Sequence, residues 1–466
     1  MPTERQWRLL STVRRALSTD PSRVALTELQ PVLGETVVVK ILDLALRLGE
    51  SMFAVGASAH DVTFAITRVA KVYGLVGVHV EVTYDAISLS YHRSEDDWPT
   101  TLMRVVRAAS PDHAKLQRLQ ALFADITDGL DLGEARAAFR VIRRTPFLYR
   151  PIVVIFARAL LAVGVAVLYS AEPIIILLSF IAALGAAFTQ AGLARLQVPS
   201  FFSQIAGGVV ITAITTVVSA LGQAGVAPFV DANPSIIVAS GIVLMLSGLT
   251  VVGAAQDAID GFALTAVGRI LDLTMQTLGV VLGILIGLEL ARLFGFTIPL
   301  PTDAIPFGTP FEQVSGAIII SVAVALFNGA GLRIIIVSAV LSTVAIVAYS
   351  AALHLDVQPG AASAVGALLA SFLGILVARG LHVPSVAVTT AAIVPLVPGT
   401  AVFRGLLGMV QSDGTAEGML VGIGPLVLAA SIGIGLAAGA SLGLYLGTPL
   451  RATLATVSKS RARVRR

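Results

Sequence analysis

The feature that most constrains this chain is a series of ten apolar stretches, each long enough to cross a lipid bilayer as a helix. They lie at about residues 152–170, 173–191, 201–223, 235–254, 271–294, 314–331, 333–353, 360–378, 385–403 and 419–447. A helix satisfies its backbone hydrogen bonds within the segment itself, as the lipid interior requires. The sequence therefore predicts an all-α polytopic membrane protein with about ten transmembrane helices.

Composition separates a soluble part from the membrane part. Of the 466 residues, 56% are hydrophobic and 13% are charged, against about 25% charged in soluble domains. Residues 1–150 contain 19 Lys and Arg with 17 Asp and Glu, whereas residues 151–450 contain seven Arg, eleven acidic residues and no Lys. Residues 451–466 carry six basic residues and no acidic one. We expect a soluble domain, a membrane region and a basic cytoplasmic tail near anionic lipid, with no nucleic acid as partner.

The soluble part begins with a charged arm at residues 1–30, and residues 31–150 are predicted to form a small α/β domain. Residues 76–83 and 86–91 alternate apolar and polar side chains, which is typical of a β-hairpin, and residues 102–106 are a candidate third strand. Helical spacing predicts four helices, at residues 36–55, 58–73, 112–129 and 132–144. Ser58 opens the second of them with a capping-box pattern.

The charges between the apolar stretches predict the orientation. If the α/β domain is cytoplasmic, the outer loops are acidic and the inner loops are basic, with Arg195, Arg269, Arg333, Arg379 and the tail. This is the bias expected in a cell membrane, and Arg292 and Arg404, which fall toward the outer side, weigh against it only weakly. An even number of spans then leaves both termini in the cytoplasm.

The ten stretches divide into two groups of five, residues 151–295 and 314–450, with an outer loop at 296–313 between them. Asn-Pro-Ser opens the fourth stretch and Val-Pro-Ser opens the ninth. The fifth and tenth stretches have glycine at every fourth position, at Gly279, Gly283, Gly287, Gly435, Gly439, Gly443 and Gly447. Because five is odd, the two units must run in opposite directions, which predicts the two inverted five-helix repeats of secondary transporters. Glycine faces of this kind also suit helix packing between copies, so a homo-oligomer is a further prediction.

The ninth stretch is interrupted where a helix should continue. Pro395 and Pro398 each lack a backbone donor, and Gly399 adds a flexible point. Unwound backbone at membrane depth is tolerated where protein buries it or where it lines a cavity. A helix beginning near Thr400 directs free N–H groups at the break, which suits a carboxylate. The alternative is a proline kink that serves packing alone.

Ionisable residues mark a candidate pathway. Asp257 and Asp260 are three residues apart and are predicted to share one face of a helical turn, and two close carboxylates can share a proton. Charges inside spans are costly unless they are paired or hydrated. Asp272 joins the proton-coupling candidates, and Arg158, Arg269 and Glu289 are candidates for ion pairs. The alternatives are that Asp257, Asp260, Arg269 and Asp272 lie in a cytoplasmic loop, and that Glu289 pairs with Arg292 at the outer interface.

The residues around the break resemble a known family. Ile-Val-Pro-Leu-Val-Pro-Gly at 393–399, with Phe-Arg-Gly at 403–405, resembles the signature of the second half of the threonine/serine exporter family. Gly-Ala-Ala-Gln-Asp-Ala-Ile-Asp-Gly at 253–261 is similar to the family's Asp-containing motif, and Gly49 and the turn at 56–58 are placed as in that family. The resemblance covers residues 36–450 and implies export of threonine and serine driven by the proton gradient. Where the family's first half usually has Pro-Gly, this chain has Val252-Gly253, which predicts a softer break there.

These parts suggest a mechanism of alternating access. The predicted substrate-binding residues are Pro395, Pro398, Gly399, Thr400, Arg404, Gly253, Thr389 and Thr390. The substrate carboxylate is expected at the helix start near Gly399 and Thr400, assisted by Arg404. Asp257 is expected to take the ammonium group or the coupling proton.

Two alternative functions remain open at this point. A passive small-solute channel would need a continuous polar pore, against which the scarcity of charge argues. A membrane-tethered hydrolase would use Ser58, His60 and Asp61 of the α/β domain, although local capping explains Ser58 and Asp61 without chemistry. The chain has no cysteine and no histidines at metal-ligand spacing, so we expect neither a metal nor a cofactor.

Overall fold

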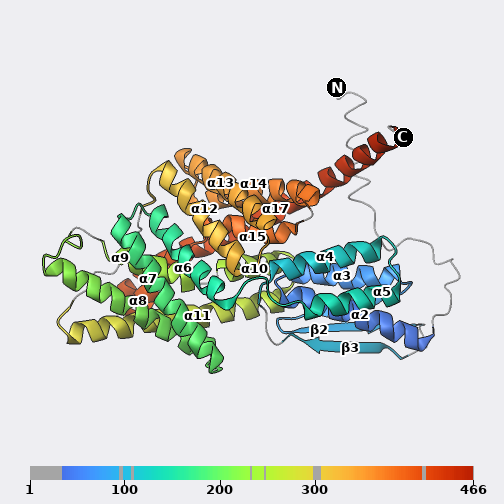
Figure 1. Ribbon diagram of the computed structural model, residues 1–466, viewed down its shortest axis with the longest axis horizontal. Coiled ribbons are helices and arrows are strands. Elements are labelled where there is room, and N and C mark those ends of the chain that lie inside the picture. The colour runs from blue at the N-terminus through green and yellow to red at the C-terminus, as the bar shows by residue number, and fades with distance from the viewer. Residues whose placement is uncertain are drawn as a thin grey trace.

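The structure is a computed structural model that describes residues 34–93, 98–106, 110–230, 233–245, 248–296, 306–381, 383–411 and 416–464. The predicted arm at 1–30 lies outside these residues. A helical bundle and a smaller α/β region lie side by side, and the C-terminal helix runs out of the bundle past the α/β region (Figure 1).

The α/β region has the elements that the sequence predicts. Its helices are α2 (Glu35–Ala54), α3 (Ala59–Val72), α4 (His113–Thr127) and α5 (Leu132–Arg144), and its strands are β1 (Val78–Val82), β2 (Ala86–Tyr91) and β3 (Thr100–Val105). The strands form one antiparallel sheet in the order β1-β2-β3. The predicted hairpin and the candidate third strand are both confirmed.

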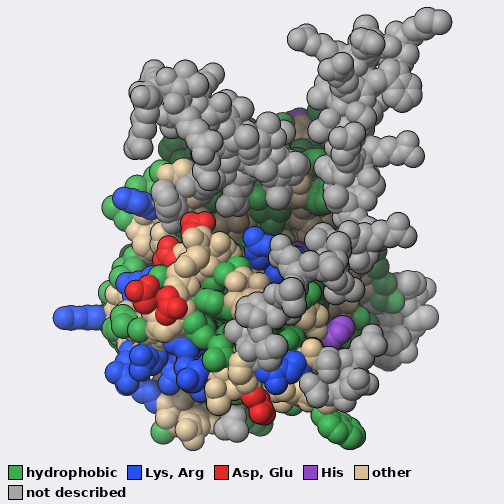
Figure 2. Space-filling view, turned by 90° about the vertical axis from the view of Figure 1, so that its right-hand side faces the viewer, with side chains coloured by type: hydrophobic (Ala, Val, Ile, Leu, Met, Phe, Trp, Pro, Cys, Tyr) green, Lys and Arg blue, Asp and Glu red, His purple; other side chains and the backbone are tan. Residues whose placement is uncertain are grey.

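Apolar spacing and local capping explain why these elements form. On α2, Ile41, Leu42 and Leu48 are at most 1% exposed and face α3 and the sheet. The hydroxyl of Ser58 accepts a hydrogen bond from the backbone N–H of Asp61 at 3.0 Å and so caps α3. The far end of this region shows clusters of basic and acidic side chains (Figure 2), as expected of a surface in water.

The bundle contains eight straight helices in the described residues that are long and apolar enough to cross a membrane, and up to ten spans if each of two bent helix pairs is one. The straight helices are α6 (Pro151–Leu168), α7 (Pro173–Arg195), α8 (Ser200–Gln223), α11 (Ala263–Leu293), α12 (Pro310–Phe327), α13 (Leu332–His354), α14 (Pro359–Leu381) and α17 (Ala416–Val464). The predicted mostly helical membrane fold is confirmed. Helix α17 continues into the predicted basic tail.

The two bent pairs lie at the fourth and ninth predicted spans. The ninth is α15 (Ser385–Ile393), a 3-10 turn η1 (Val394–Leu396) and α16 (Gly399–Gln411), with a bend of 54°. Pro395 and Pro398 sit in this bend, so the predicted interruption is confirmed.

The fourth span is α9 (Ser235–Met245) and α10 (Gly248–Ile259), bent by 47°. The prediction of a soft break at Val252-Gly253 was wrong, because α10 continues through both residues and the bend lies before it. Valine and glycine both keep their backbone N–H groups, so neither removes the helix hydrogen bond that a proline would.

Glycine lets several helices approach backbone to backbone. Gly164 of α6 lies against the carbonyl oxygen of Gly316 of α12, and a Cβ on Gly164 would lie 2.9 Å from that oxygen. Gly279 of α11 faces α8, where a Cβ would lie 2.7 Å from the carbonyl oxygen of Phe201. Gly439 of α17 faces α14, where a Cβ would overlap the carbonyl oxygen of Ala364.

The predicted glycine stripes therefore pack inside the chain. In each half, the fifth span uses its glycines to contact the third span of the same half. A homo-oligomer stays a prediction, and it would need a surface other than these stripes.

The close packing predicts that Gly439→Ala destabilises the protein by about 1–3 kcal/mol, because the new methyl group collides with backbone that cannot move freely. Gly424→Ala on the same helix is the control, since a Cβ there meets nothing within 4 Å. Thermal unfolding of the two purified variants in one detergent measures the difference. Equal unfolding temperatures for the two variants would contradict the close contact.

Candidate functional site

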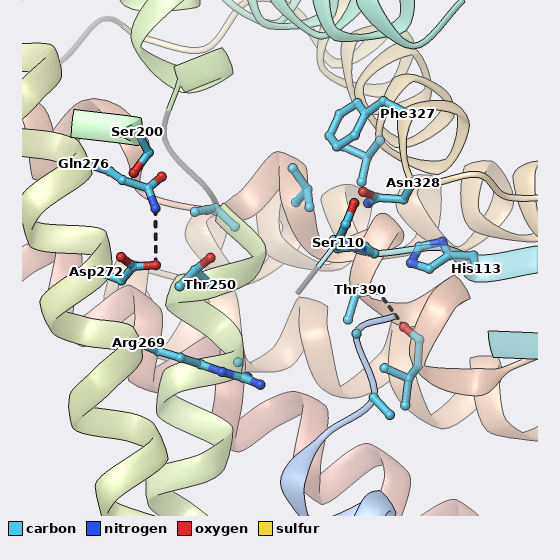
Figure 3. Close-up of a pocket in the computed structure, with 18 of the residues that line it drawn as sticks. Ser110, His113, Ser200, Thr250, Arg269, Asp272, Gln276, Phe327, Asn328 and Thr390 are labelled. Atoms are coloured by element: carbon cyan, nitrogen blue, oxygen red, sulfur yellow. Dashed lines mark hydrogen bonds between the residues drawn. The ribbon is translucent and has the colours of Figure 1, made fainter. Parts of the chain in front are cut away.

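A cavity of about 1090 Å³ lies between the helices and the α/β region. In Figure 3, Arg269, Asp272 and Gln276 lie on one side of it, and Phe327, Asn328 and Thr390 lie across from them. The α/β region contributes further lining residues that include Phe53, Ser58, Tyr84, Ser110 and His113. The cavity thus has walls from the first five spans, from the last five spans and from the α/β region.

Asp257 lies where the first five spans meet the α/β region. Its side chain is 1% exposed, and its Oδ2 forms an ion pair with Nη1 of Arg269 on α11 at 3.0 Å. The backbone N–H of Ala59, the first residue of α3, hydrogen-bonds the same carboxylate. A carboxylate at a helix N-terminus also interacts favourably with the helix dipole. Asp257 therefore ties the first half of the bundle to the α/β region.

The other predicted acidic residues are placed differently. Asp260 is exposed in the turn after α10, so the loop alternative holds for it. Asp272 lines the cavity from α11 and accepts a hydrogen bond from Gln276 at 3.5 Å. Glu289 is exposed and forms an ion pair with Arg292, and its place at the outer interface stays a prediction. It is not among the lining residues of the cavity.

Further contacts fix the α/β region to the helices α10 and α11. The hydroxyl of Thr265 donates to the carbonyl oxygen of Val82 at 3.2 Å, and the ring of Tyr84 packs directly on Gly268. Tyr84 also hydrogen-bonds Asp272, and this bond together with burial raises the pKa of Tyr84 to about 12. The guanidinium of Arg269 lies 5.8 Å from the ring centre of Phe53.

A second set of contacts fixes the α/β region to the other half. The backbone N–H groups of His113 and Ala114 donate to the carbonyl oxygens of Asn328 and Gly329 at 2.8 and 3.2 Å. The backbone N–H groups at the start of α4 therefore bond the carbonyl oxygens that follow α12. Each helix end thus supplies the partners that the other end lacks. The hydroxyl of Tyr149 donates to the carbonyl oxygen of Ala330 at 2.7 Å. The α/β region thus bridges both halves across one end of the cavity.

The break between α15 and α16 reaches the cavity only in part. Of the predicted substrate-binding residues, Gly399, Thr390 and Gly253 line it, whereas Pro395, Pro398, Thr400, Arg404 and Thr389 are not among its lining residues. The hydroxyl of Thr390 donates to the carbonyl oxygen of Val386 at 2.6 Å, and that of Thr389 to Ser385 at 2.9 Å. Both threonines therefore bond the backbone of their own helix, as threonines in spans commonly do.

Aromatic residues that the sequence reasoning missed lie at the other end of α6, about 27 Å from its start. Tyr169 stacks on Phe307 with ring centres 5.8 Å apart, and Phe307 meets Tyr349 edge-on at 6.2 Å. The hydroxyl of Tyr169 lies 3.5 Å from that of Thr400, next to the break. These residues come from three distant segments, and no local pattern in the sequence connects them.

Neither a metal site nor a hydrolase site is assembled from the described residues. They contain no group of three or more His, Asp or Glu that could hold a metal ion. The hydroxyl of Ser58 serves as the cap of α3. What the arrangement offers instead is a large cavity lined in part by charged and polar side chains, between the membrane spans and the α/β region.

Fold and cavity together define a multi-pass membrane protein with an internal polar cavity, and the sequence comparisons give its family. A profile described as "Putative threonine/serine exporter" matches residues 43–291, and one described as "Threonine/Serine exporter, ThrE" matches residues 313–442. The chain belongs to the threonine/serine exporter family, which is a family of transporters and not of enzymes.

Two relatives match over most of their length. The "Probable threonine/serine exporter" of Mycobacterium tuberculosis is 33% identical over 88% of this chain and 77% of its own. The "Threonine/serine exporter" of Corynebacterium glutamicum is 28% identical over 89% of this chain and 84% of its own. No solved structure matches the chain.

The burial of His113 at the contact between α4 and α12 predicts that the stability of the protein depends on pH. His113 is 5% exposed, and burial lowers its pKa from 6.5 to about 4. The unfolded chain therefore binds a proton between pH 6.5 and 4 that the folded chain does not, so folding is weakened as the pH falls through this window. The difference between the two pKa values corresponds to about 3 kcal/mol.

Thermal unfolding at pH 7 and pH 4.5 measures this effect. We expect His113→Gln to lose less stability between the two pH values than the wild type does. His79→Gln, on an exposed position of β1, is the control and should behave like the wild type. An unchanged pH dependence in His113→Gln would show that His113 is not buried as a neutral group.

Proposed function

We propose that this protein exports threonine and serine from the cytoplasm by alternating access, with the proton gradient as the driving force. The observation that carries the proposal is the buried carboxylate of Asp257 beside a polar cavity between the two halves. Family membership and the names of both relatives support the substrate class.

The substrate is proposed to bind in the cavity beside the helix break. Gly399 and Thr390 face the cavity from the second half and Gly253 from the first. Pro395 and Pro398 hold the break open, so its backbone groups are available to a polar ligand.

Asp257 is the proposed proton-coupling residue. Neutralising its carboxylate would remove the ion pair with Arg269 and weaken the bond to Ala59, both of which depend on its charge. Asp260, in the turn after α10, and Asp272, on α11, are proposed to pass protons to it. A charge buried in a low-dielectric site responds strongly to the loss of its partner.

Contacts at two separate places in the bundle support alternating access. The α/β region covers one end and is proposed to form the inner closure, with both termini in the cytoplasm. Tyr169, Phe307 and Tyr349 are proposed to form the outer closure. The matching glycine contacts of the fifth and tenth spans support two inverted repeats, which would move against each other. A passive channel would not need two separate closures.

A transport assay tests the proton-coupled mechanism. Vesicles that contain the protein are loaded with labelled threonine, and efflux is measured with and without an uncoupler. We expect the uncoupler to slow efflux. We also expect Asp257→Asn to slow gradient-driven efflux by about tenfold or more, because losing a buried charge changes the free energy by more than the roughly 1.4 kcal/mol that corresponds to a tenfold effect.

Asp356→Asn is the matched control, because Asp356 is exposed in the loop after α13 and outside the cavity. Undiminished efflux in Asp257→Asn would remove Asp257 from the mechanism. Efflux that ignores the uncoupler and does not saturate would favour the passive channel.

The inner closure is tested by a disulfide, because the chain has no cysteine of its own. A Cβ on Gly268 would lie 2.8 Å from the Cβ of Tyr84, so Tyr84→Cys with Gly268→Cys needs little movement to form the bond. We expect oxidation to stop efflux and reduction to restore it, while each single variant is insensitive to oxidant. Full efflux in the oxidised double variant would show that the α/β region does not have to leave α11.

A further inference from the structure

Arg158 is a cation inside a membrane helix, and it has no carboxylate partner among the described residues. It is the eighth residue of α6, and its accessible side chain lines the cavity. Arg269 pairs with Asp257, and Arg292 pairs with Glu289. Within the described residues, no carboxylate oxygen lies within 4.0 Å of the Arg158 guanidinium.

An unpaired charge at this depth requires a physical reason. A charged side chain in a span costs free energy unless it is hydrated or paired, and such residues commonly mark substrate pathways. The Arg158 guanidinium lies 6.0 Å from the ring centre of Phe327. This cation–π contact orients the guanidinium but leaves its N–H groups without an anionic partner.

The surroundings of Arg158 add a neutral donor. Phe327 is followed by Asn328, which also lines the cavity and is 4% exposed. Its Nδ2 has no hydrogen-bond partner. A buried amide without a partner is costly, so its N–H₂ group is a second observation that points to a ligand on this wall.

The opposite wall carries the negative charge. Asp272 lies with Arg269 on α11, across the cavity from Phe327 and Asn328 (Figure 3). Asp257 of α10 also lines the cavity and forms the ion pair with Arg269. One wall therefore presents a cation and a neutral donor, and the other presents two carboxylates with the single guanidinium of Arg269. An α-amino acid is a zwitterion and matches this separation of charge.

We propose that Arg158 binds the α-carboxylate of the transported amino acid, with Asn328 as a neighbouring donor. A guanidinium and a carboxylate form two parallel hydrogen bonds, a geometry that lysine or an amide cannot reproduce. The ammonium group of the substrate then points toward Asp272 and Asp257. This inference rests on the proposed function and assigns the carboxylate to α6 instead of to the start of α16.

The test compares threonine with threoninol, which has the same hydroxyl and ammonium groups but no carboxylate. Binding of both compounds to purified wild type, Arg158→Gln and Arg158→Lys is measured by calorimetry in detergent. We expect Arg158→Gln to bind threonine about 10- to 100-fold more weakly, the range for losing a hydrogen bond to a charged group, and to bind threoninol as the wild type does. The affinity of Arg158→Lys for threonine should lie between those of the wild type and Arg158→Gln.

Arg333→Gln is the control, since Arg333 is exposed near the start of α13 and outside the cavity. Equal loss for threonine and threoninol in Arg158→Gln, or no loss for threonine, would overturn the assignment. If the wild type itself binds no threonine, the proposed function fails and not only the role of Arg158.

Discussion

The structure depends on one buried carboxylate that joins α10, α11 and the α/β region. Asp257 lies near the end of α10 in the bent fourth span, pairs with Arg269 on α11 and accepts the first amide of α3. Because its side chain is 1% exposed, removing any one partner would leave a charge without compensation in a poorly hydrated place. The α/β region therefore has, beside the uncharged contacts of Thr265 and Tyr84, an electrostatic contact with the first half that a change of charge can release.

The attachment to the second half is of a different kind. There, backbone N–H groups of α4 meet carbonyls that follow α12, and none of these groups changes its charge. The chain also passes directly from α5 into α6, and α6 packs on α12 through Gly164 and Gly316. This asymmetry supports a movement in which the α/β region stays with α12 and leaves α10 and α11.

Local chemistry explains what the sequence predicted correctly. Span lengths follow from apolar runs, the hairpin from strict alternation, and the break at Pro395 and Pro398 from two missing donors. Tertiary contacts explain what it missed. Nothing near Asp257 reveals that Ala59, almost 200 positions earlier, meets its carboxylate, and Tyr169, Phe307 and Tyr349 form a cluster only because three helices end together. The break of the fourth span was misplaced because Val252-Gly253 was judged by its position in the motif, although its donors are intact.

The measurement that tests the central claim most directly is hydrogen exchange at the start of α3 in the wild type and in Asp257→Asn. If the Asp257 charge holds the α/β region against the first half, the amides of residues 59–62 exchange faster in Asp257→Asn, while those of residues 113–116 at the start of α4 are unchanged. Equal protection of residues 59–62 in the two proteins would contradict the claim.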